Sequence, residues 1–399
     1  MSHPTATGDT AQNLIRARLR QLLADRDPAT TPAAEFRGAQ YDTGLAWVWF
    51  PVGWGGLGLH PDLQDVIDDE LARAGAPAGE ETSGIALGMA APTVVAHGSD
   101  EQKQRHLRKI FTGEHVWCQL FSEPGAGSDL AGLATQAVRD GDEWVINGQK
   151  VWTSFAHIAD WAMLLARTDP DVPKHQGLTY FLLDMRSPGV EVRALREMTG
   201  EAQFSEVFLP DIRIPDSQRL GAVGDGWRVA ISTLMSERTS MGSGFGAPVQ
   251  DAIAIWRDRG LSNAVQRDAL AQLWVRSEAN RMLGLRAQQL RKSGVPGPEG
   301  SIAKLASAEL AQQVYDFCLE LLGAESMLFP ARYTPHRIER GGQLLAGRDL
   351  PWLFVRSRGF TIEGGTSEVQ RNILAERILG LPGDARVDRD IPWKQIPRG

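Results

Sequence analysis

Three short segments of this 399-residue chain carry residues that could bind a flat or phosphorylated ligand. In residues 119–130 an apolar run ends in Ser-Glu and continues as Pro-Gly-Ala-Gly-Ser-Asp. Glycines in such a turn let a ligand approach the main chain, and the turn offers N–H groups and hydroxyls as donors. The second segment is Lys150-Val-Trp-Thr-Ser154, and the third, residues 362–371, is Ile-Glu-Gly-Gly-Thr-Ser-Glu-Val-Gln-Arg. An aromatic ring can stack on a heterocycle, and Thr366 is a suitable N-cap for a helix.

The elements that must position these segments form three successive parts. Helical spacing extends to about residue 114 and includes a capped helix from Ser99 that ends at Gly113. Short β-type runs follow, and Asn147-Gly148 predicts the turn of a hairpin. We predict strands at 161–165, 178–183, 190–192 and 206–209, and later helices from about residue 224, at 249–259, 265–291, 301–323 and 366–379.

This order of elements predicts an α+β protein in which helical domains flank a β domain. The expected units are an N-terminal helical domain (1–114), a middle β domain (115–220), a C-terminal helical domain (221–382) and a tail (383–399). The tail is polar and contains several prolines, and it could lie on a neighbouring subunit or on its own domain.

Composition excludes several classes of function. The net charge of −7 argues against a nucleic-acid partner, and the chain has no basic block. Cys118 and Cys318 each lie in an apolar run, which predicts two buried thiols and a reducing compartment. Without an apolar stretch of membrane-helix length or a basic–apolar signal pattern, the sequence predicts a cytoplasmic protein with no membrane partner.

The remaining sequence motifs do not indicate a dinucleotide-binding, metal-binding or hydrolase site. Residues 53–58 match the G-x-G-x-x-G pattern of dinucleotide-binding folds. That fold needs a helix that opens within the motif and a further parallel strand, whereas here the next helix begins only near Pro61. The chain also lacks a metal-ligand cluster, a His-Glu-x-x-His signature and a Gly-x-Ser-x-Gly elbow. Neither a Rossmann dinucleotide site nor a metal site is therefore expected.

In residue type, spacing and order, the three segments resemble those of acyl-CoA dehydrogenases, and the resemblance covers nearly the whole chain. It implies an acyl-CoA dehydrogenase-like fold with an N-terminal helical domain, a middle β-barrel or sandwich and a C-terminal four-helix bundle. It also implies FAD as cofactor and an acyl-CoA as substrate. By this resemblance the flavin contacts are Phe121, Ser122, Trp152, Ser154, Thr366 and Glu368, and the substrate contacts are Ser128, Arg238 and Gly364.

The catalytic base implied by the resemblance occupies an unusual place. Many family members carry a glutamate immediately before the Gly-Thr of the third segment, but here that position is Gly364. Glu363 is displaced by one residue. Members similar to isovaleryl- and long-chain acyl-CoA dehydrogenases carry the glutamate on an earlier helix, before an arginine, as in Glu237-Arg238. A glycine at 364 leaves room for that carboxylate, so the resemblance favours Glu237 over Glu363. Taken alone, Glu237-Arg238 is typical of a surface ion pair.

The implied reaction is α,β-dehydrogenation of an acyl-CoA to the trans-2-enoyl-CoA. Glu237 would remove the α-proton as the β-hydride passes to flavin N5, and electrons would leave to an electron-transfer flavoprotein. The chain departs from the family at Arg259–Arg267, where the usual Arg-x-x-Phe-Gly element of the subunit interface is missing. A homodimer or homotetramer is expected. One alternative is a single subunit of a heteromeric dehydrogenase, and another is a flavin oxidase or monooxygenase on the same fold.

Overall fold

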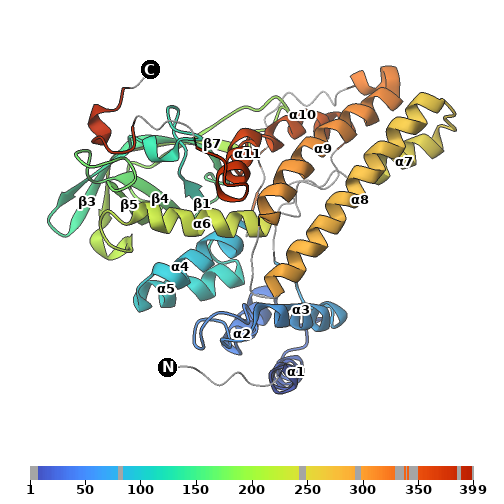
Figure 1. The fold of residues 1–399 in the computed structure, drawn as a ribbon. Coiled ribbons are helices and arrows are strands. Elements are labelled where there is room, and N and C mark those ends of the chain that lie inside the picture. The colour runs from blue at the N-terminus through green and yellow to red at the C-terminus, as the bar shows by residue number, and fades with distance from the viewer. Residues whose placement is uncertain are drawn as a thin grey trace.

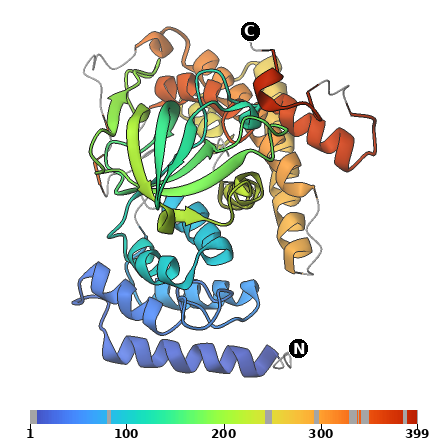
Figure 2. The same cartoon turned by 90° about the vertical axis from the view of Figure 1, so that its left-hand side faces the viewer.

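Along the chain, the described residues form an N-terminal helical part, then a mixed β-sheet, then a C-terminal helical part (Figure 1). The computed structural model describes residues 8–79, 84–241, 249–292, 298–328, 337, 339–340, 349–383 and 388–397. A few side chains in helices, that of Arg238 among them, lie outside this description. In Figures 1 and 2 the N-terminal helices lie below the sheet, and the long C-terminal helices stand beside it.

Five helices form the N-terminal part. They are α1 (Gly8–Asp25), α2 (Ala33–Asp42), α3 (Gln64–Arg73), α4 (Ala91–His97) and α5 (Asp100–Thr112). The predicted caps of α5 are confirmed: Ser99 and Gln102 form a capping box, and Gly113 ends the helix at φ 82°. Residues 53–58 form a turn between α2 and α3, so the dinucleotide pattern there has no strand to follow.

Eight strands form the sheet, in the order β6-β7-β3-β2-β4-β5-β8, and β1 pairs with β4 in parallel. The strands are β1 (Trp117–Leu120), β2 (Gln136–Asp140), β3 (Glu143–Ser154), β4 (Trp161–Arg167), β5 (Leu178–Asp184), β6 (Glu191–Ala194), β7 (Phe204–Pro215) and β8 (Arg219–Leu220). Alternate residues of β4 and β5 enter two different cores. Met163 and Leu182 pack toward the N-terminal helices. Leu164 and Phe181 pack against residues of β3 and β7, so the curved sheet encloses its own second core.

The hairpin predicted at Asn147-Gly148 is wrong. Both residues lie inside β3, and the turn between β2 and β3 lies instead at residues 141–142, where Gly141 has φ 62°. Asn147 and Gly148 form a bulge against β7, at which the pairing register shifts. The Asn147 side chain exchanges two hydrogen bonds with Asp211, at 2.9 and 3.1 Å. Asn147-Gly148 therefore forms a bulge within β3 and not a hairpin turn. The hydrogen bonds that stabilise this bulge come from Asp211 of β7, about 60 positions further along the chain.

We expect Gly148→Ala to lower the free energy of unfolding by about 1–3 kcal/mol, the usual range for overpacking. A Cβ at Gly148 would lie 2.6 Å from Thr135 Cβ, which cannot move without the main chain just before β2. Thermal and denaturant unfolding would measure the change. Gly284→Ala in α8 is the matched control, because no atom lies within 4 Å of its Cβ position and alanine favours a helix. Equal stability of the two variants would contradict this explanation.

The C-terminal part is a bundle arranged around α9 (Glu299–Leu322). The other helices are α6 (Gly226–Met241), α7 (Val249–Asp258), α8 (Ala264–Lys292), α10 (Leu350–Phe360) and α11 (Ser367–Arg377). The apolar stripe Val314, Phe317 and Leu321 is buried in the core that α9 shares with α7, α8 and α10. Helix α10 was not expected from the sequence. Helix α6 runs along the sheet, where it contacts β4, β5 and α9 (Figure 1).

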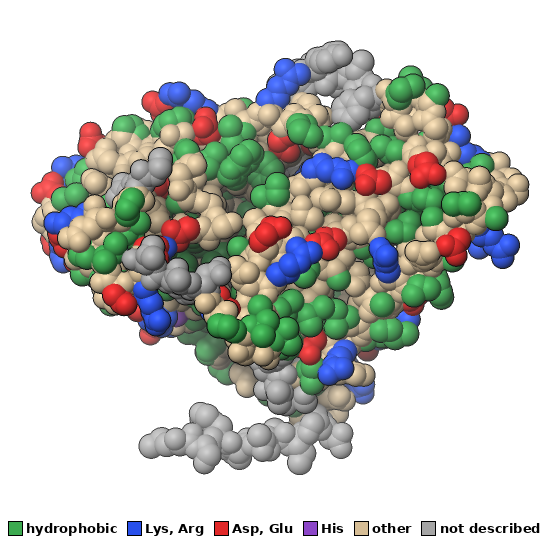
Figure 3. All heavy atoms as spheres, turned by 45° about the horizontal axis from the view of Figure 1, so that its top comes forward, with side chains coloured by type: hydrophobic (Ala, Val, Ile, Leu, Met, Phe, Trp, Pro, Cys, Tyr) green, Lys and Arg blue, Asp and Glu red, His purple; other side chains and the backbone are tan. Residues whose placement is uncertain are grey.

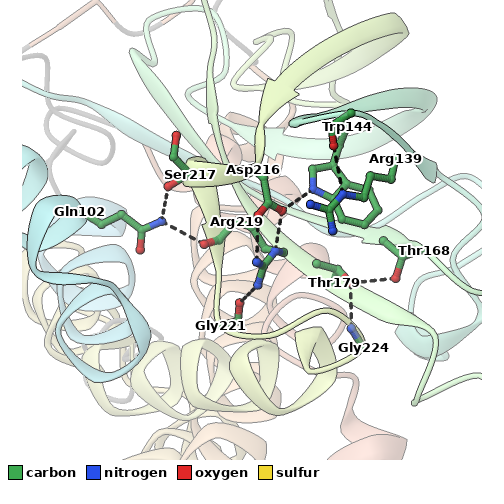
Figure 4. A network of polar contacts seen from close by, with 11 residues as sticks. Gln102, Arg139, Trp144, Thr168, Thr179, Asp216, Ser217, Arg219, Gly221 and Gly224 are labelled. Atoms are coloured by element: carbon green, nitrogen blue, oxygen red, sulfur yellow. Dashed lines mark hydrogen bonds and ion pairs between the residues drawn. The ribbon is translucent and has the colours of Figure 1, made fainter.

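A polar network joins the N-terminal helices to the edge of the sheet (Figure 4). Gln102 of α5 donates to the main-chain oxygens of Ser217 and Arg219 at 2.9 and 3.0 Å. Arg219 binds Asp216, which also accepts from Trp144 Nε1 at 2.7 Å. These bonds fix the approach to α6, because Arg219 also donates to the carbonyl of Gly221, just before that helix.

The tail folds back onto the β domain of its own chain. Trp393 is buried, donates to the carbonyl of Gly132 at 3.1 Å, and lies under the guanidinium of Arg167, 4.1 Å from the ring centre. Lys174 bridges Asp388 of the tail at 2.5 Å and Asp129 at 2.8 Å. The tail therefore braces the turn that carries Ser128.

Both cysteines are buried free thiols, as predicted, and burial raises the pKa of Cys318 to about 12.

On the face shown in Figure 3, acidic and basic side chains are interspersed over the surface. Within the described residues, the helices are too short or too polar to cross a membrane.

Candidate active site

A buried ion pair joins the first sequence segment to the second. Lys150 is fully buried, and its ammonium lies 2.8 Å from Glu123 Oε1 and 3.0 Å from the carbonyl of Phe121. Glu123 also accepts from the main-chain N–H groups of Ala134 and Thr135, at 2.6 and 2.9 Å. Burial alone would raise the pKa of Glu123, but the charge of Lys150 and these hydrogen bonds hold it below its usual value. The turn at residues 124–129, called the glycine turn below, is thus anchored to β3 through Glu123, the residue just before it.

Trp152 is held in a strained and exposed position. Its φ is 60°, a left-handed conformation that is rare for a bulky residue, and its side chain is 61% exposed. It lies at a second bulge of β3, between Lys150 and Thr153. Strain of this kind persists where the surrounding structure enforces it and is common at functional sites. An exposed indole fixed in this way fits the flat face of a bound heterocycle.

An aromatic and ionic chain connects Trp152 to the third segment. Its ring packs edge-on against Phe204 of β7, with centroids 6.0 Å apart. The guanidinium of Arg356 in α10 lies 5.7 Å from the Phe204 ring centre. Arg356 also binds both oxygens of Glu363, at 2.7 and 2.9 Å. The third segment, more than 200 positions further along the chain, is therefore brought to the first two.

The third segment makes a tight turn before α11. Gly364 and Gly365 have φ values of 63° and 89°, which glycine adopts without strain. Their carbonyls accept hydrogen bonds from Gln370 Nε2 at 3.1 Å and from Lys304 Nζ at 2.6 Å. Thr366 caps α11, as predicted, by accepting from the N–H of Val369 at 3.1 Å. The turn is thus held by hydrogen bonds from two helices, α11 through Gln370 and α9 through Lys304.

The carboxylate of Glu237 lies beside this turn. Glu237 Oε1 is 3.8 Å from the position that a Cβ on Gly364 would occupy. Glycine at 364 and glutamate at 237 therefore occupy adjoining space, whereas Glu363 is turned toward Arg356. The side chain of Arg238 lies outside the described residues, so its predicted substrate contact stays a prediction.

The remaining predicted residues lie on the three segments themselves. Ser122 follows buried Phe121 and its carbonyl accepts from Val151 N at 2.9 Å, while Ser128 is exposed on the glycine turn. Ser154 pairs with Phe204 at the end of β3. A hollow of about 430 Å³ opens at the start of α11, and its lining includes Gln312, Gln313, Thr366, Ser367, Glu368 and Arg371.

The residues present fit a flavin. Ser367 Oγ and Gln370 Oε1 are buried at the start of α11 with no hydrogen-bond partner, and Thr153 Oγ1 is in the same state beside Trp152. Buried polar atoms usually have partners, so these atoms indicate a polar ligand. The N-terminus of α11 favours phosphate oxygens, and Trp152 offers an aromatic face. Phe121, Ser122, Trp152, Ser154, Thr366 and Glu368 would hold the cofactor.

Sequence reasoning missed three residues that assemble the site: Lys150 as an anchor, Arg356 and Lys304. Lys150 stands inside the second segment, but its partner Glu123 is 27 positions away. Lys304 is the only basic residue of α9 and is flanked by Ile302, Ala303 and Leu305, and an isolated cation in an apolar run was a usable signal. No sequence pattern indicated Arg356.

Comparison with known proteins matches nearly the whole chain to one family. Residues 4–114, 118–212 and 224–379 match the family models of the N-terminal, middle and C-terminal domains of acyl-CoA dehydrogenase. Acyl-CoA dehydrogenase FadE34 of Mycobacterium tuberculosis is 42% identical over 89% of this chain, but the match spans only 47% of FadE34. Acyl-CoA dehydrogenase IpdE1 of the same organism is 37% identical over 86% of each chain.

Solved structures show the same fold. The Tcur3481-Tcur3483 steroid ACAD superposes with a TM-score of 0.71 at 26% identity, over 96% of this chain and 100% of that one. The ChsE4-ChsE5 complex from Mycobacterium tuberculosis gives 0.68 at 29% identity, with the same coverage. Two further structures of the fold, a glutaryl-CoA dehydrogenase from Mycobacterium smegmatis and PigA, contain FADH2 and FAD. The chain belongs to the acyl-CoA dehydrogenase family.

Proposed function

We propose that this protein dehydrogenates an acyl-CoA thioester between its α- and β-carbons, with Glu237 as the base that removes the α-proton. The observation that carries the proposal is the placement of the Glu237 carboxylate beside Gly364, in the space that the usual glutamate of the family would fill. A carboxylate in a partly buried site suits this task, because desolvation raises its pKa toward neutrality.

The protein would contribute binding, orientation and proton removal. FAD, when bound, supplies the acceptor for the β-hydride. The Glu123–Lys150 pair holds the glycine turn, from which Ser128 would contact the CoA portion of the substrate. Main-chain N–H groups near Gly364 would hold the thioester oxygen and stabilise the developing enolate, a contribution of several kcal/mol. Glu237 would then receive the α-proton.

The first test is the visible spectrum of the purified protein during anaerobic addition of a panel of acyl-CoAs. A flavin absorbance that bleaches with one thioester would support the proposal and identify the acyl group. A flavin that no thioester reduces would overturn it. Oxygen uptake with peroxide release during turnover would instead favour the oxidase or monooxygenase alternative.

Glu363→Gln is expected to leave substrate-driven flavin reduction within about threefold of the parent, far from the 10²–10⁴-fold loss typical of a missing base. Both oxygens of its carboxylate are bound by Arg356. Stopped-flow absorbance would measure the rate. A loss of 100-fold or more with flavin still bound would assign the base to Glu363 and overturn the role given to Glu237.

We further propose a bulky acyl group as substrate and an electron-transfer flavoprotein as electron acceptor. One solved structure that resembles this chain is a steroid ACAD, and Gly364 leaves the wall of the site without a side chain. The panel of acyl-CoAs should therefore include straight-chain, branched and sterol-derived thioesters. Faster flavin reduction by short straight chains than by the bulky thioesters would contradict this substrate class.

A second candidate is one subunit of a heteromeric dehydrogenase. In place of the Arg-x-x-Phe-Gly element, Arg259 forms an ion pair with Glu325 and donates to the carbonyl of Leu322 within the same chain. The ChsE4-ChsE5 structure is a complex of two different chains. Purification of this chain alone decides: a yellow, active homo-oligomer excludes the heteromer, and a colourless chain that gains flavin only with a partner supports it.

A further inference from the structure

Lys304 is buried where three parts of the candidate site meet. It lies on α9, which contacts both α6 and α11. Its side chain is almost completely buried, and its Nζ donates to the carbonyl of Gly365 at 2.6 Å. An ammonium is costly to bury unless charges and acceptors compensate it, so its surroundings must favour the cation.

The neighbouring carboxylates supply this compensation. Lys304 Cε and Glu237 Oε1 each lie 3.8 Å from the same point, the Cβ position of Gly364. Burial lowers the pKa of Lys304, and Glu363, Glu237, Glu309 and Glu368 act in the opposite direction. Glu363 and Glu309 are bound by Arg356 and Arg371.

The other charged groups near α6 lie toward its beginning. His97 of α4 contacts Ser232, and Arg228 binds Asp225. These residues are one or more helical turns before Glu237. Two described cations thus lie near the Gly364 turn: Arg356 is bound to Glu363, and Lys304 shares the space beside Gly364 with the Glu237 carboxylate.

We propose that Lys304 is a positioning residue for the dehydrogenation: it fixes the Gly364–Gly365 turn through the carbonyl of Gly365 and holds Glu237 in its ionised form. This inference rests on the function proposed for Glu237. Through Lys304, helix α9 would set the pH range in which Glu237 is ionised and can act as the base.

The expected direction follows from electrostatics. A nearby cation favours the charged form of a carboxylate and lowers its pKa by about 1–3 units, whereas burial without a cation raises that pKa. A general base works only when ionised. Removal of the Lys304 charge should therefore raise the pKa of Glu237 and move the acidic limb of the pH–rate profile to higher pH.

Lys304→Met tests this on the flavin-loaded protein. We expect the acidic limb of the flavin-reduction rate to move up by about 1–3 pH units. Lys304→Arg, which keeps the charge, should leave the limb near its original position. If Lys304→Met fails to fold, Lys304→Gln removes the charge but retains a donor. Carbon-13 NMR of protein labelled at its glutamate carboxyls would measure the pKa of Glu237 directly, with the signal assigned through Glu237→Gln.

The outcomes separate this inference from the proposed function. A rate that falls equally at every pH, with the NMR pKa of Glu237 unchanged, would leave Lys304 a purely structural role and overturn the inference. A shifted limb and a raised NMR pKa would support it. If Glu237→Gln itself reduces flavin normally, the proposed function fails first, irrespective of the Lys304 variants.

Discussion

Glu237→Gln should retain bound flavin yet lose substrate-driven flavin reduction by about 10²–10⁴-fold, the usual contribution of a general base. The amide has nearly the same shape as the carboxylate and cannot accept the α-proton. The Gly364 turn should stay in place, because its carbonyls are held by Gln370 and Lys304. Anaerobic stopped-flow absorbance would follow the flavin, and the resting spectrum would report on its binding.

A second readout isolates proton removal from hydride transfer. Exchange of the substrate α-protons with D2O, followed by NMR, requires the base but not hydride transfer, and it should disappear in Glu237→Gln. Glu363→Gln is the matched control, since it makes the same change one residue before Gly364. Parent-like reduction and exchange in Glu237→Gln would rule out Glu237 as the base.

Lys150→Met should lower the free energy of unfolding by about 3–5 kcal/mol, the cost of breaking a buried ion pair on one side. Lys150 is fully buried, and Glu123 would keep its charge with only the N–H groups of Ala134 and Thr135 as partners. Flavin affinity should fall as well, because the glycine turn loses its link to β3. Denaturant unfolding and flavin titration would measure the two effects.

Low pH should reduce the difference in the free energy of unfolding between the parent protein and Lys150→Met. Because the pKa of Glu123 in the folded protein lies below the unfolded value of about 4.3, its pairing stabilises the parent above that value and is lost as the pH falls through the folded pKa. In Lys150→Met the buried carboxylate instead destabilises the fold above about pH 4.3, and protonation relieves it. The difference in the free energy of unfolding should thus be largest near pH 7, narrow as the pH falls toward about 4.3 because the variant's Glu123 takes up a proton, and narrow further below that value as the parent loses its ion pair.

Two controls test that the loss comes from a buried charge. Arg73→Gln breaks an exposed pair with Glu70 and should cost less than about 1 kcal/mol. The double variant Lys150→Met with Glu123→Gln removes both charges and should recover part of the loss. A loss of less than 1 kcal/mol in Lys150→Met, or no recovery in the double variant, would contradict this account of the pair.

Local patterns in the sequence predicted the elements whose own residues specify them. The capping box at Ser99 and Gln102 specifies α5, and alternation or helical spacing identified β4, β5 and α9. The three segments predicted to bind a ligand were also visible, because each carries glycines, a helix cap or an aromatic residue close together.

The errors arose where distant contacts override local preference. Asn147-Gly148 is a turn signal in isolation, but pairing with Asp211 of β7 makes it a bulge. The partners of Glu363 and Gly365, namely Arg356 and Lys304, are set by the packing of α10 and α9. Such pairings depend on the fold as a whole, so spacing in the chain does not indicate them.

The Glu123–Lys150 pair also constrains how this sequence can change over generations. Either residue replaced alone leaves a buried charge without its counterpart, and the fold loses a large part of its marginal stability. A neutral pair of similar volume could fill the same space, but it requires two changes, and the first alone is costly. Substitutions at positions 123 and 150 are therefore expected to occur together. This coupling links the turn at residues 124–129 to strand β3 in the variation that the sequence can accept.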